Sequence, residues 1–194
     1  NFKMFPSLEA QISSISDDIA YNNHDIQDGI RAKMFHINDL KEINFFNEIY
    51  KSYKKNIMNN NEDILIYQLV RDSINYMVKD LIRNTIKNLK KNRINTLKQV
   101  YTSKNQLVCF SSKFIKIDKQ IRTFLREKMY NDKKVLIKNN EGKKIIKKLF
   151  TYISKYPSKF LRKNNSEQSK HRSIADFISG MTDRYAINLY KSLK

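Results

Sequence analysis

Apolar residues recur at intervals of three and four in at least five segments of this chain, and this spacing constrains the fold more than any other feature. Such spacing places the apolar side chains on one face of an α-helix. No segment sustains the every-second-residue alternation of a half-buried strand, and no internal repeat is visible. The sequence therefore predicts an all-α fold, a multi-helix bundle packed as one compact unit.

The first predicted helix begins at Leu8, because Ser7 is a suitable N-cap and the apolar periodicity continues from there to Ile30. Gly29 lies near its end, and we expect the helix to weaken or bend there. Further helices are predicted over residues 39–54, 61–93, 113–130, 142–155, 173–179 and 183–193.

The segments between these helices carry their own signals. Residues 106–110 fit either a short strand or a buried turn, and the polar residues 163–170 are predicted to form a loop. Pro157 closes the helix before it, Gly180 stops the next one, and Thr182 can cap the last.

The formal net charge of +19 supports two interpretations. Lysine and arginine neutralise phosphates, so the charge favours nucleic-acid binding. However, the chain has 29 Lys, 25 Ile and 22 Asn but only 5 Ala, the usage expected of codons rich in adenine and thymine, and such lysines can simply occupy solvated helix faces. Residues 1–50 hold 4 basic and 8 acidic side chains, which distinguishes them from residues 51–194.

Several classes of protein are excluded by composition. With three glycines in the chain, neither glycine-rich phosphate-binding loop can be built. The single Cys109 permits no internal disulfide and no cysteine-based zinc site, which fits a reducing compartment such as the cytosol. No apolar run approaches the ~20 residues of a membrane span, so we expect no membrane partner.

An acidic stripe on the first helix is the most informative feature. Asp17, Tyr21, Asp25 and Asp28 fall within an arc of about 80° at 100° per residue, away from the isoleucines. Like charges at this spacing repel one another, so a metal ion, a cationic phosphate pocket or scattered lysines must compensate. The stripe is therefore either a binding site or a solvated acidic face.

The His24-Asp25 pair is a weaker candidate for metal binding. Imidazole and carboxylate are common ligands, but neighbouring residues on a helix point 100° apart. His36 and His171 do not form a metal-binding spacing with His24.

Three strings resemble the deoxyguanosinetriphosphate triphosphohydrolase-like proteins of the HD superfamily. They are residues 6–29 (PSLEAQISSISDDIAYNNHDIQDG) with Arg31-Ala32 after them, residues 124–130 (FLREKMY) and residues 174–186 (IADFISGMTDRYA). Their order and separation match the C-terminal half of that family over essentially the whole chain. The resemblance implies an HD-type helical bundle, with residues 1–50 as the end of the catalytic core and residues 51–194 as the phosphohydrolase-associated helices.

The resemblance also implies roles for single residues. Asp17 corresponds to the last ligand of a divalent metal ion (Mg, Mn or similar), Tyr21 to a phenol beside the triphosphate, and Asp25 to the carboxylate that reads the sugar 3′-hydroxyl. Arg122 falls where related enzymes carry a basic group near the phosphates. Gln27 replaces the family's usual acidic residue. The implied reaction is attack of metal-activated hydroxide on a deoxynucleoside triphosphate, which releases deoxynucleoside and tripolyphosphate.

The family's early His and its His-Asp pair have no counterpart in this chain. We therefore expect the chain alone to be inactive and to need an N-terminal catalytic half as partner, in a homo-oligomer of the bacterial cytoplasm. The alternative is a non-catalytic basic helical module that binds nucleic acid or serves oligomerisation.

Overall fold

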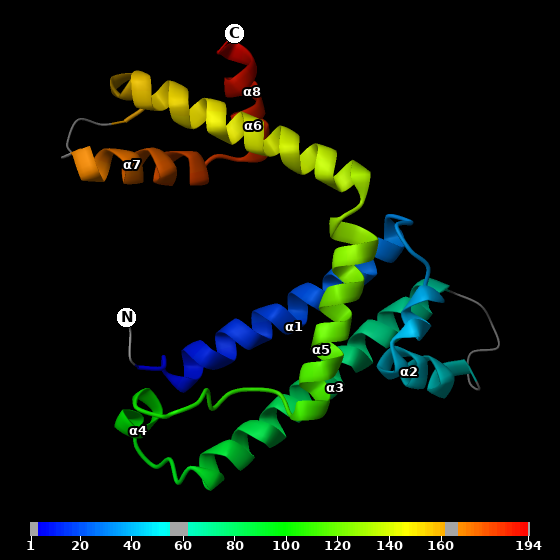
Figure 1. Ribbon diagram of the computed structural model, residues 1–194. Coiled ribbons are helices and arrows are strands. Elements are labelled where there is room, and N and C mark those ends of the chain that lie inside the picture. Colours follow the sequence, from blue (N-terminus) through cyan, green and yellow to red (C-terminus); the bar gives the residue numbers. More distant parts are fainter. Residues whose placement is uncertain (1–3, 55–61, 162–166, 194) are drawn as a thin grey trace. The chain divides into compact units, whose positions relative to one another are not determined.

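The structure of the protein, a computed structural model, describes residues 4–54, 62–161 and 167–193 (Figure 1). Every regular element in these ranges is a helix, which confirms the predicted all-α fold. The helices are α1 (Leu8–Arg31), η1 (Asp39–Glu42), α2 (Asn44–Lys54), α3 (Glu62–Lys91), α4 (Leu97–Tyr101), α5 (Ser112–Leu125), the π-helical η2 (Arg126–Tyr130), α6 (Lys133–Lys155), η3 (Pro157–Lys159), α7 (Glu167–Ser179) and α8 (Asp183–Ser192).

The contacts divide the chain into two compact units. Unit 1 is Asn1–Asp132 and unit 2 is Lys133–Lys194. Residue 50, where the charge of the sequence changes, lies within α2 and inside unit 1, and α2 packs against α3. The net charge of the sequence changes near residue 50, but the residues before and after it contribute to the same hydrophobic core.

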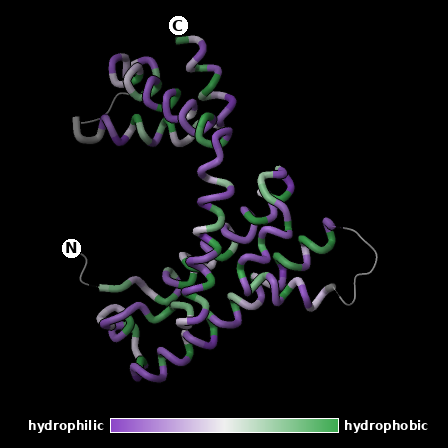
Figure 2. Tube along the Cα trace, turned by 45° about the vertical axis from the view of Figure 1, so that its right-hand side comes forward, coloured by the Kyte–Doolittle hydropathy of each residue, from purple (hydrophilic) through white to green (hydrophobic). Residues whose placement is uncertain are grey.

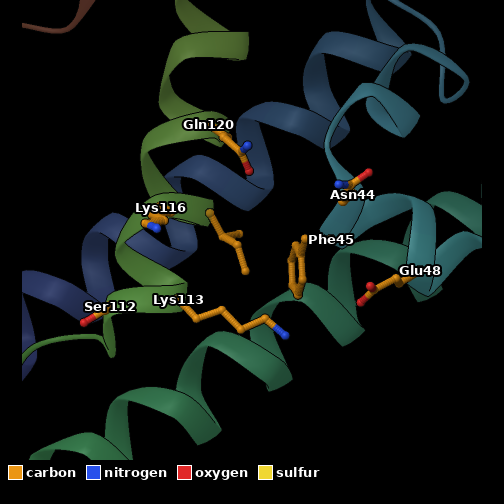
Figure 3. Close-up of a pocket in the computed structure, with 8 residues that line it drawn as sticks. Asn44, Phe45, Glu48, Ser112, Lys113, Lys116 and Gln120 are labelled. Atoms are coloured by element: carbon orange, nitrogen blue, oxygen red, sulfur yellow. The ribbon is translucent and has the colours of Figure 1, made fainter.

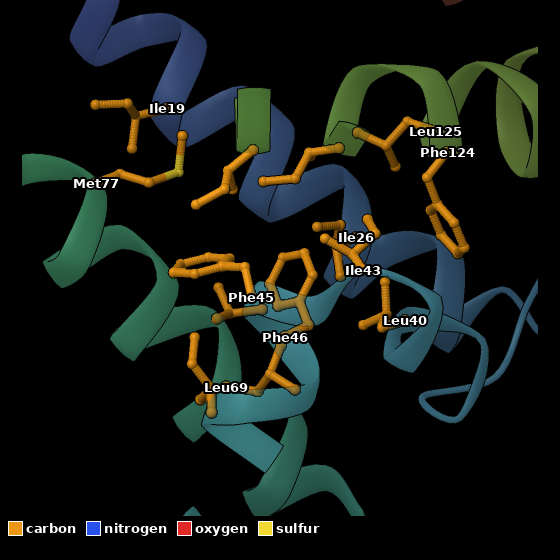
Figure 4. Close-up of a cluster of buried hydrophobic side chains, with 14 of the residues drawn as sticks. Ile19, Ile26, Leu40, Ile43, Phe45, Phe46, Leu69, Met77, Phe124 and Leu125 are labelled. Carbon is orange, nitrogen blue, oxygen red and sulfur yellow. The ribbon is translucent and has the colours of Figure 1, made fainter. Parts of the chain in front are cut away.

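Helices α1, α2, α3 and α5 enclose the core of unit 1. Figure 4 shows Ile19 of α1 beside Met77 of α3, and Phe46 of α2 close to Leu69 of α3. Each of these side chains is almost fully buried, and burial of one such side chain stabilises the fold by about 1.5–3 kcal/mol. Hydrophobic and hydrophilic residues alternate at short intervals along the helices (Figure 2), as amphipathic packing requires.

Gly29 allows a close approach inside unit 1. A Cβ at this position would lie 2.3 Å from Cε1 of Phe35, whose ring packs edge-on against Phe124 at 4.9 Å between ring centroids. The helix α1 continues past Gly29 to Arg31. The glycine therefore makes room for an aromatic ring.

Both long helices of unit 1 end in the same way, with a basic residue in the left-handed region. Lys33 follows α1 with φ 56°, and Arg93 follows α3 with φ 51°. After α1, the amide of Met34 donates to the carbonyl of Gly29 and the amide of Lys33 to that of Ile30. The same pair of bonds occurs after α3. Glycine usually occupies this position, and here basic residues replace it.

The segment 106–110 forms a buried turn and no strand. The amides of Leu107 and Val108 donate to the side-chain oxygen of Gln11 at 3.1 and 3.2 Å, and Gln11 in turn donates to the carbonyl of Pro6 at 2.8 Å. Gln11 is 2% exposed. A buried glutamine on α1 thus supplies the hydrogen bonds that a neighbouring strand would otherwise supply.

Unit 2 has its own smaller core between α6, α7 and α8. Leu149, Ile153 and Ile174 are fully buried at its centre. Thr182 caps α8 as predicted, with its hydroxyl accepting from the amide of Tyr185 at 3.3 Å.

The observed helices differ from the predicted ones at three boundaries and by one additional helix. The helix expected over residues 39–54 is broken by the extended backbone of Ile43 into η1 and α2. Helix α6 begins at Lys133, so Gly142 lies inside it instead of starting it. Helix α7 begins at Glu167, within the expected loop 163–170, whose residues 163–166 lie outside the described residues. The short helix α4 was not expected, although Thr96 and Gln99 form its capping box.

Candidate functional site

Helix α1 carries the acidic stripe on the face away from the core. Its start is fixed by Ser7, whose hydroxyl accepts from the amide of Ala10 at 3.4 Å. Ile19 and Ile26 are buried against α3 and α5, so the opposite side of the helix faces outward. Asp17 is exposed there, and Tyr21 is 59% exposed.

Asp25 is half-buried and accepts a hydrogen bond from the hydroxyl of Tyr130. Tyr130 is the last residue of η2, where the π-helical turn continues α5. Burial raises the pKa of Tyr130, and the nearby Asp25 carboxylate and Tyr21 phenol raise it further. Tyr21, Asp25 and Tyr130 therefore form one cluster, the tyrosine–aspartate cluster. The sequence interpretation gave Tyr130 no role, because no local pattern indicates a contact with a residue 105 positions away.

Arg122 makes a different set of contacts. Its Nε donates to Asp118 on the same helix at 2.8 Å, and its Nη2 donates to Asp18 on α1 at 3.1 Å. The amide of Asn22 donates to the other oxygen of Asp118 at 3.2 Å. Burial disfavours the charge on Arg122, but the two carboxylates outweigh it and raise its pKa. Arg122 thus links α1 to α5 and is paired with Asp18 and Asp118, not with the stripe residues.

A metal ion would find an incomplete set of ligands in the described residues. Asp17 is an exposed carboxylate that can supply one ligand, and His24 is also exposed. No group of three or more His, Cys, Asp or Glu side chains in the described ranges is placed to hold a metal ion. The residues present therefore fit one ligand of a metal site and not a whole site.

An open cavity of about 460 Å³ lies elsewhere in unit 1, between α2 and α5. Phe45 and Glu48 line it from α2, and Lys113 and Lys116 from α5 (Figure 3). The cavity offers two ammonium groups and one carboxylate beside an aromatic ring. No sequence motif pointed to it.

None of the helices in the described ranges has the length and apolar character needed to cross a membrane.

Comparison with known proteins gives the site its context. Residues 108–192 match the model of the phosphohydrolase-associated domain. The chain is 68% identical over 193 residues to a deoxyguanosinetriphosphate triphosphohydrolase-like protein of Pelagibacter ubique, with 100% of this chain and 52% of that protein covered. Proteins of the same name from Leptospira interrogans and Nitrosomonas europaea are 37% and 32% identical, with 97% and 96% of this chain and 51% and 50% of those proteins covered.

The chain spans about half the length of the curated relatives it matches. The similarity extends over both units, from the acidic stripe to the final helix. The chain thus corresponds to the C-terminal half of the deoxyguanosinetriphosphate triphosphohydrolase-like proteins and contains a phosphohydrolase-associated domain.

Proposed function

We propose that this chain supplies the substrate-binding face and one metal ligand of a deoxynucleoside triphosphate triphosphohydrolase, which releases deoxynucleoside and tripolyphosphate. The observation that carries the proposal is the tyrosine–aspartate cluster, in which a half-buried carboxylate and two phenols from distant parts of the chain meet. The names of the relatives support the same activity.

The cluster has the chemistry to bind a deoxynucleotide. Tyr130 donates to Oδ2 of Asp25, which leaves Oδ1 to accept a hydrogen bond from the sugar 3′-hydroxyl. Tyr21 lies one helical turn earlier and can donate to a phosphate oxygen without adding negative charge. Tyr130 therefore positions the carboxylate that reads the sugar.

Asp17 lies one further turn toward the N-terminus and would hold the divalent metal ion together with ligands from residues outside this chain. When bound, such an ion lowers the pKa of its water and neutralises phosphate charge. The incomplete ligand set in the described residues makes a first half, of the kind that the longer relatives contain, a required partner.

Arg122 completes the proposed phosphate-binding side. Its side chain is 46% exposed, so a triphosphate can compete with Asp18 and Asp118 for the guanidinium. In the absence of substrate, the carboxylates of Asp18 and Asp118 fix the position of the Arg122 guanidinium.

The test combines this chain with the first half of the Pelagibacter ubique relative and measures tripolyphosphate release from deoxynucleoside triphosphates with Mg²⁺ or Mn²⁺. The chain alone should release none. The combination should be active, and Asp17→Ala should abolish turnover because it removes a metal ligand. Asp28→Ala is the matched control, since Asp28 is an exposed carboxylate on the same stripe, and it should change turnover by less than about twofold.

Two more variants separate the roles within the cluster. Asp25→Ala should weaken discrimination between deoxynucleotides and analogues that lack the 3′-hydroxyl. Tyr21→Phe should weaken triphosphate binding by about 1–3 kcal/mol if its hydrogen bond is desolvated. Wild-type turnover by Asp17→Ala would overturn the metal role, and robust turnover by the chain alone would overturn the requirement for a first half.

A further inference from the structure

The net positive charge of the chain is concentrated in unit 2. Its 62 residues hold 16 basic and 4 acidic side chains, whereas the 132 residues of unit 1 hold 22 basic and 15 acidic ones. A codon bias toward adenine and thymine acts on the whole chain and does not explain why carboxylates are scarce in one unit. A charge asymmetry of this kind is typical of a surface that binds a polyanion.

A row of lysines follows the side of α6 that faces away from the core of unit 2. Its members fall within an arc of about 100°, opposite Leu149 and Ile153 of that core. All are exposed, and in the part of the chain that the structure describes none of them forms an ion pair with a carboxylate. The row, which we call the lysine face, consists of Lys144, Lys147, Lys148 and Lys155.

The sequence around the lysine face lacks compensating negative charge. Between Glu141 and Glu167 the chain contains eight basic and no acidic side chains. The lysine face therefore presents four ammonium groups along about 16 Å of helix, and a row of phosphates is the natural counterpart of such a surface.

Two tyrosine rings lie beside the lysine face. Nζ of Lys148 lies 5.0 Å from the ring centroid of Tyr190 on α8. Nζ of Lys155 and Nζ of Lys159 lie 5.3 and 5.1 Å from the ring centroid of Tyr156, which is 36% exposed. Lysines neutralise phosphates, and exposed aromatic rings stack on unpaired bases. Ammonium groups and aromatic rings at this separation match a single strand of nucleic acid, in which phosphates and bases alternate.

We propose that the lysine face and Tyr156 bind single-stranded nucleic acid, with the ammonium groups on the phosphates and the tyrosine ring on a base. The contacts are to phosphates and base faces, which DNA and RNA share, so strands of either kind should bind. This binding is additional to the proposed hydrolysis, because the residues assigned to hydrolysis all belong to unit 1.

Two other polyanions fit the surface less well. The bases of a duplex stack on one another, which leaves the ring of Tyr156 without a partner. A helix that binds an anionic membrane inserts its apolar side into the lipid, whereas the apolar Leu149 and Ile153 on the other side of α6 are fully buried in the core of unit 2.

Fluorescence anisotropy of labelled oligothymidylate and oligouridylate of about 20 nucleotides, mixed with the 194-residue chain, tests the proposal. The wild type should bind both strands more tightly than a duplex of the same length. Each neutralised phosphate adds about −0.7 to the slope of log K against log salt between about 50 and 200 mM, so four lysines predict a slope of about −3.

Two variants separate the charge from the ring. Lys148→Gln combined with Lys155→Gln should weaken binding at least about fivefold at low salt and make the slope shallower by about 1.4. Tyr156→Leu keeps the apolar bulk but removes the aromatic face, and it should weaken binding about fivefold or more with little change in the slope.

Lys79→Gln combined with Lys87→Gln is the matched control, since both are exposed lysines of α3 in unit 1 and the net charge changes equally. This variant should bind like the wild type, and all variants should keep the wild-type helical circular dichroism. No binding of either strand up to about 100 µM at low salt, or equal loss in the control, would overturn the proposal. Unchanged binding by Tyr156→Leu, or a duplex bound as tightly as the single strands, would also overturn it. Sedimentation of the chain with anionic vesicles but not with the oligonucleotides would assign the lysine face to a membrane instead.

Discussion

At the scale of single residues, the surroundings of Tyr130 favour its protonated form. Its hydroxyl is partly buried and donates to a carboxylate, and both effects raise its pKa above the ordinary value of 10.0. In the unfolded chain the phenol titrates near pH 10. The folded state therefore retains this proton at pH values where the unfolded chain has lost it.

The stabilisation from Tyr130 is fully present below about pH 10 and should be lost as the pH rises above that value toward the folded-state pKa. In Tyr130→Phe the donor to Asp25 is missing, so the variant should be less stable at pH 7 by about 1 kcal/mol. Its free energy of unfolding should also fall less steeply above pH 10. Urea denaturation between pH 7 and 11 measures both effects.

Tyr76→Phe is the control for this comparison, because Tyr76 is an exposed tyrosine of the same unit. It should follow the wild-type dependence on pH. Parallel curves for the wild type and Tyr130→Phe would show that the fold does not shift the titration of Tyr130. Coincident curves would show that the hydrogen bond to Asp25 contributes nothing to stability.

At the scale of elements, the residues that end α1 and α3 lower the free energy of unfolding through their backbone conformation. The backbones of Lys33 and Arg93 lie in the left-handed region, where a residue with a side chain loses about 1–2 kcal/mol. Their positive charges recover a few tenths of a kcal/mol by lying beside the carbonyl ends of the helices.

Replacement of either residue by glycine should therefore raise the free energy of unfolding, by about 0.5–1 kcal/mol each. Lys90→Gly, inside the last turn of α3, should have the opposite sign, because glycine weakens a helix by about 1 kcal/mol. Thermal or urea unfolding of the three variants measures the difference. If Lys33→Gly and Arg93→Gly destabilised the protein as Lys90→Gly does, the backbone conformation would not be the source of the cost.

How far the sequence predicts each element depends on whether its signal is local. Ser7 and Thr182 lie next to the amides that they cap, so both helix starts were predictable. Gly142 suggested a helix start, but it lies within α6, where a Cβ would meet no other atom within 4 Å. No close approach requires a glycine at this position, and Gly142 is accommodated inside the helix.

In the candidate site, too, the sequence predicts the local features and not the contacts between distant residues. The common face of Asp17, Tyr21 and Asp25 follows from helix geometry, since all three belong to α1. The contact of Asp25 with Tyr130 and that of Arg122 with Asp18 join residues more than 100 positions apart. They depend on how α5 packs on α1, which no local spacing encodes.

At the scale of the whole molecule, the two units have separate cores. Among the residues that the structure describes, the core of unit 1 contains 21 buried apolar residues and that of unit 2 contains three. A core of three residues excludes water from little apolar surface, so unit 2 should be the less stable of the two.

Calorimetric unfolding should accordingly show two transitions, with unit 2 melting first. Ile153→Ala removes a fully buried side chain of unit 2 and should destabilise that unit by about 2–5 kcal/mol. The higher transition should stay in place, whereas Leu69→Ala in unit 1 should lower it. One transition that shifts with both variants would mean that the units unfold as one.

The hydrogen bonds of Gln11 also determine when, during synthesis of the chain, the start of α1 can complete its contacts. Gln11 accepts from amides 96 and 97 positions later in the chain. A ribosome that adds about 5–20 residues per second needs about 5–20 s to reach them. The side-chain oxygen of Gln11 therefore lacks these two donors until most of unit 1 has been made, so the first turn of α1 can reach its final hydrogen bonding only late in synthesis.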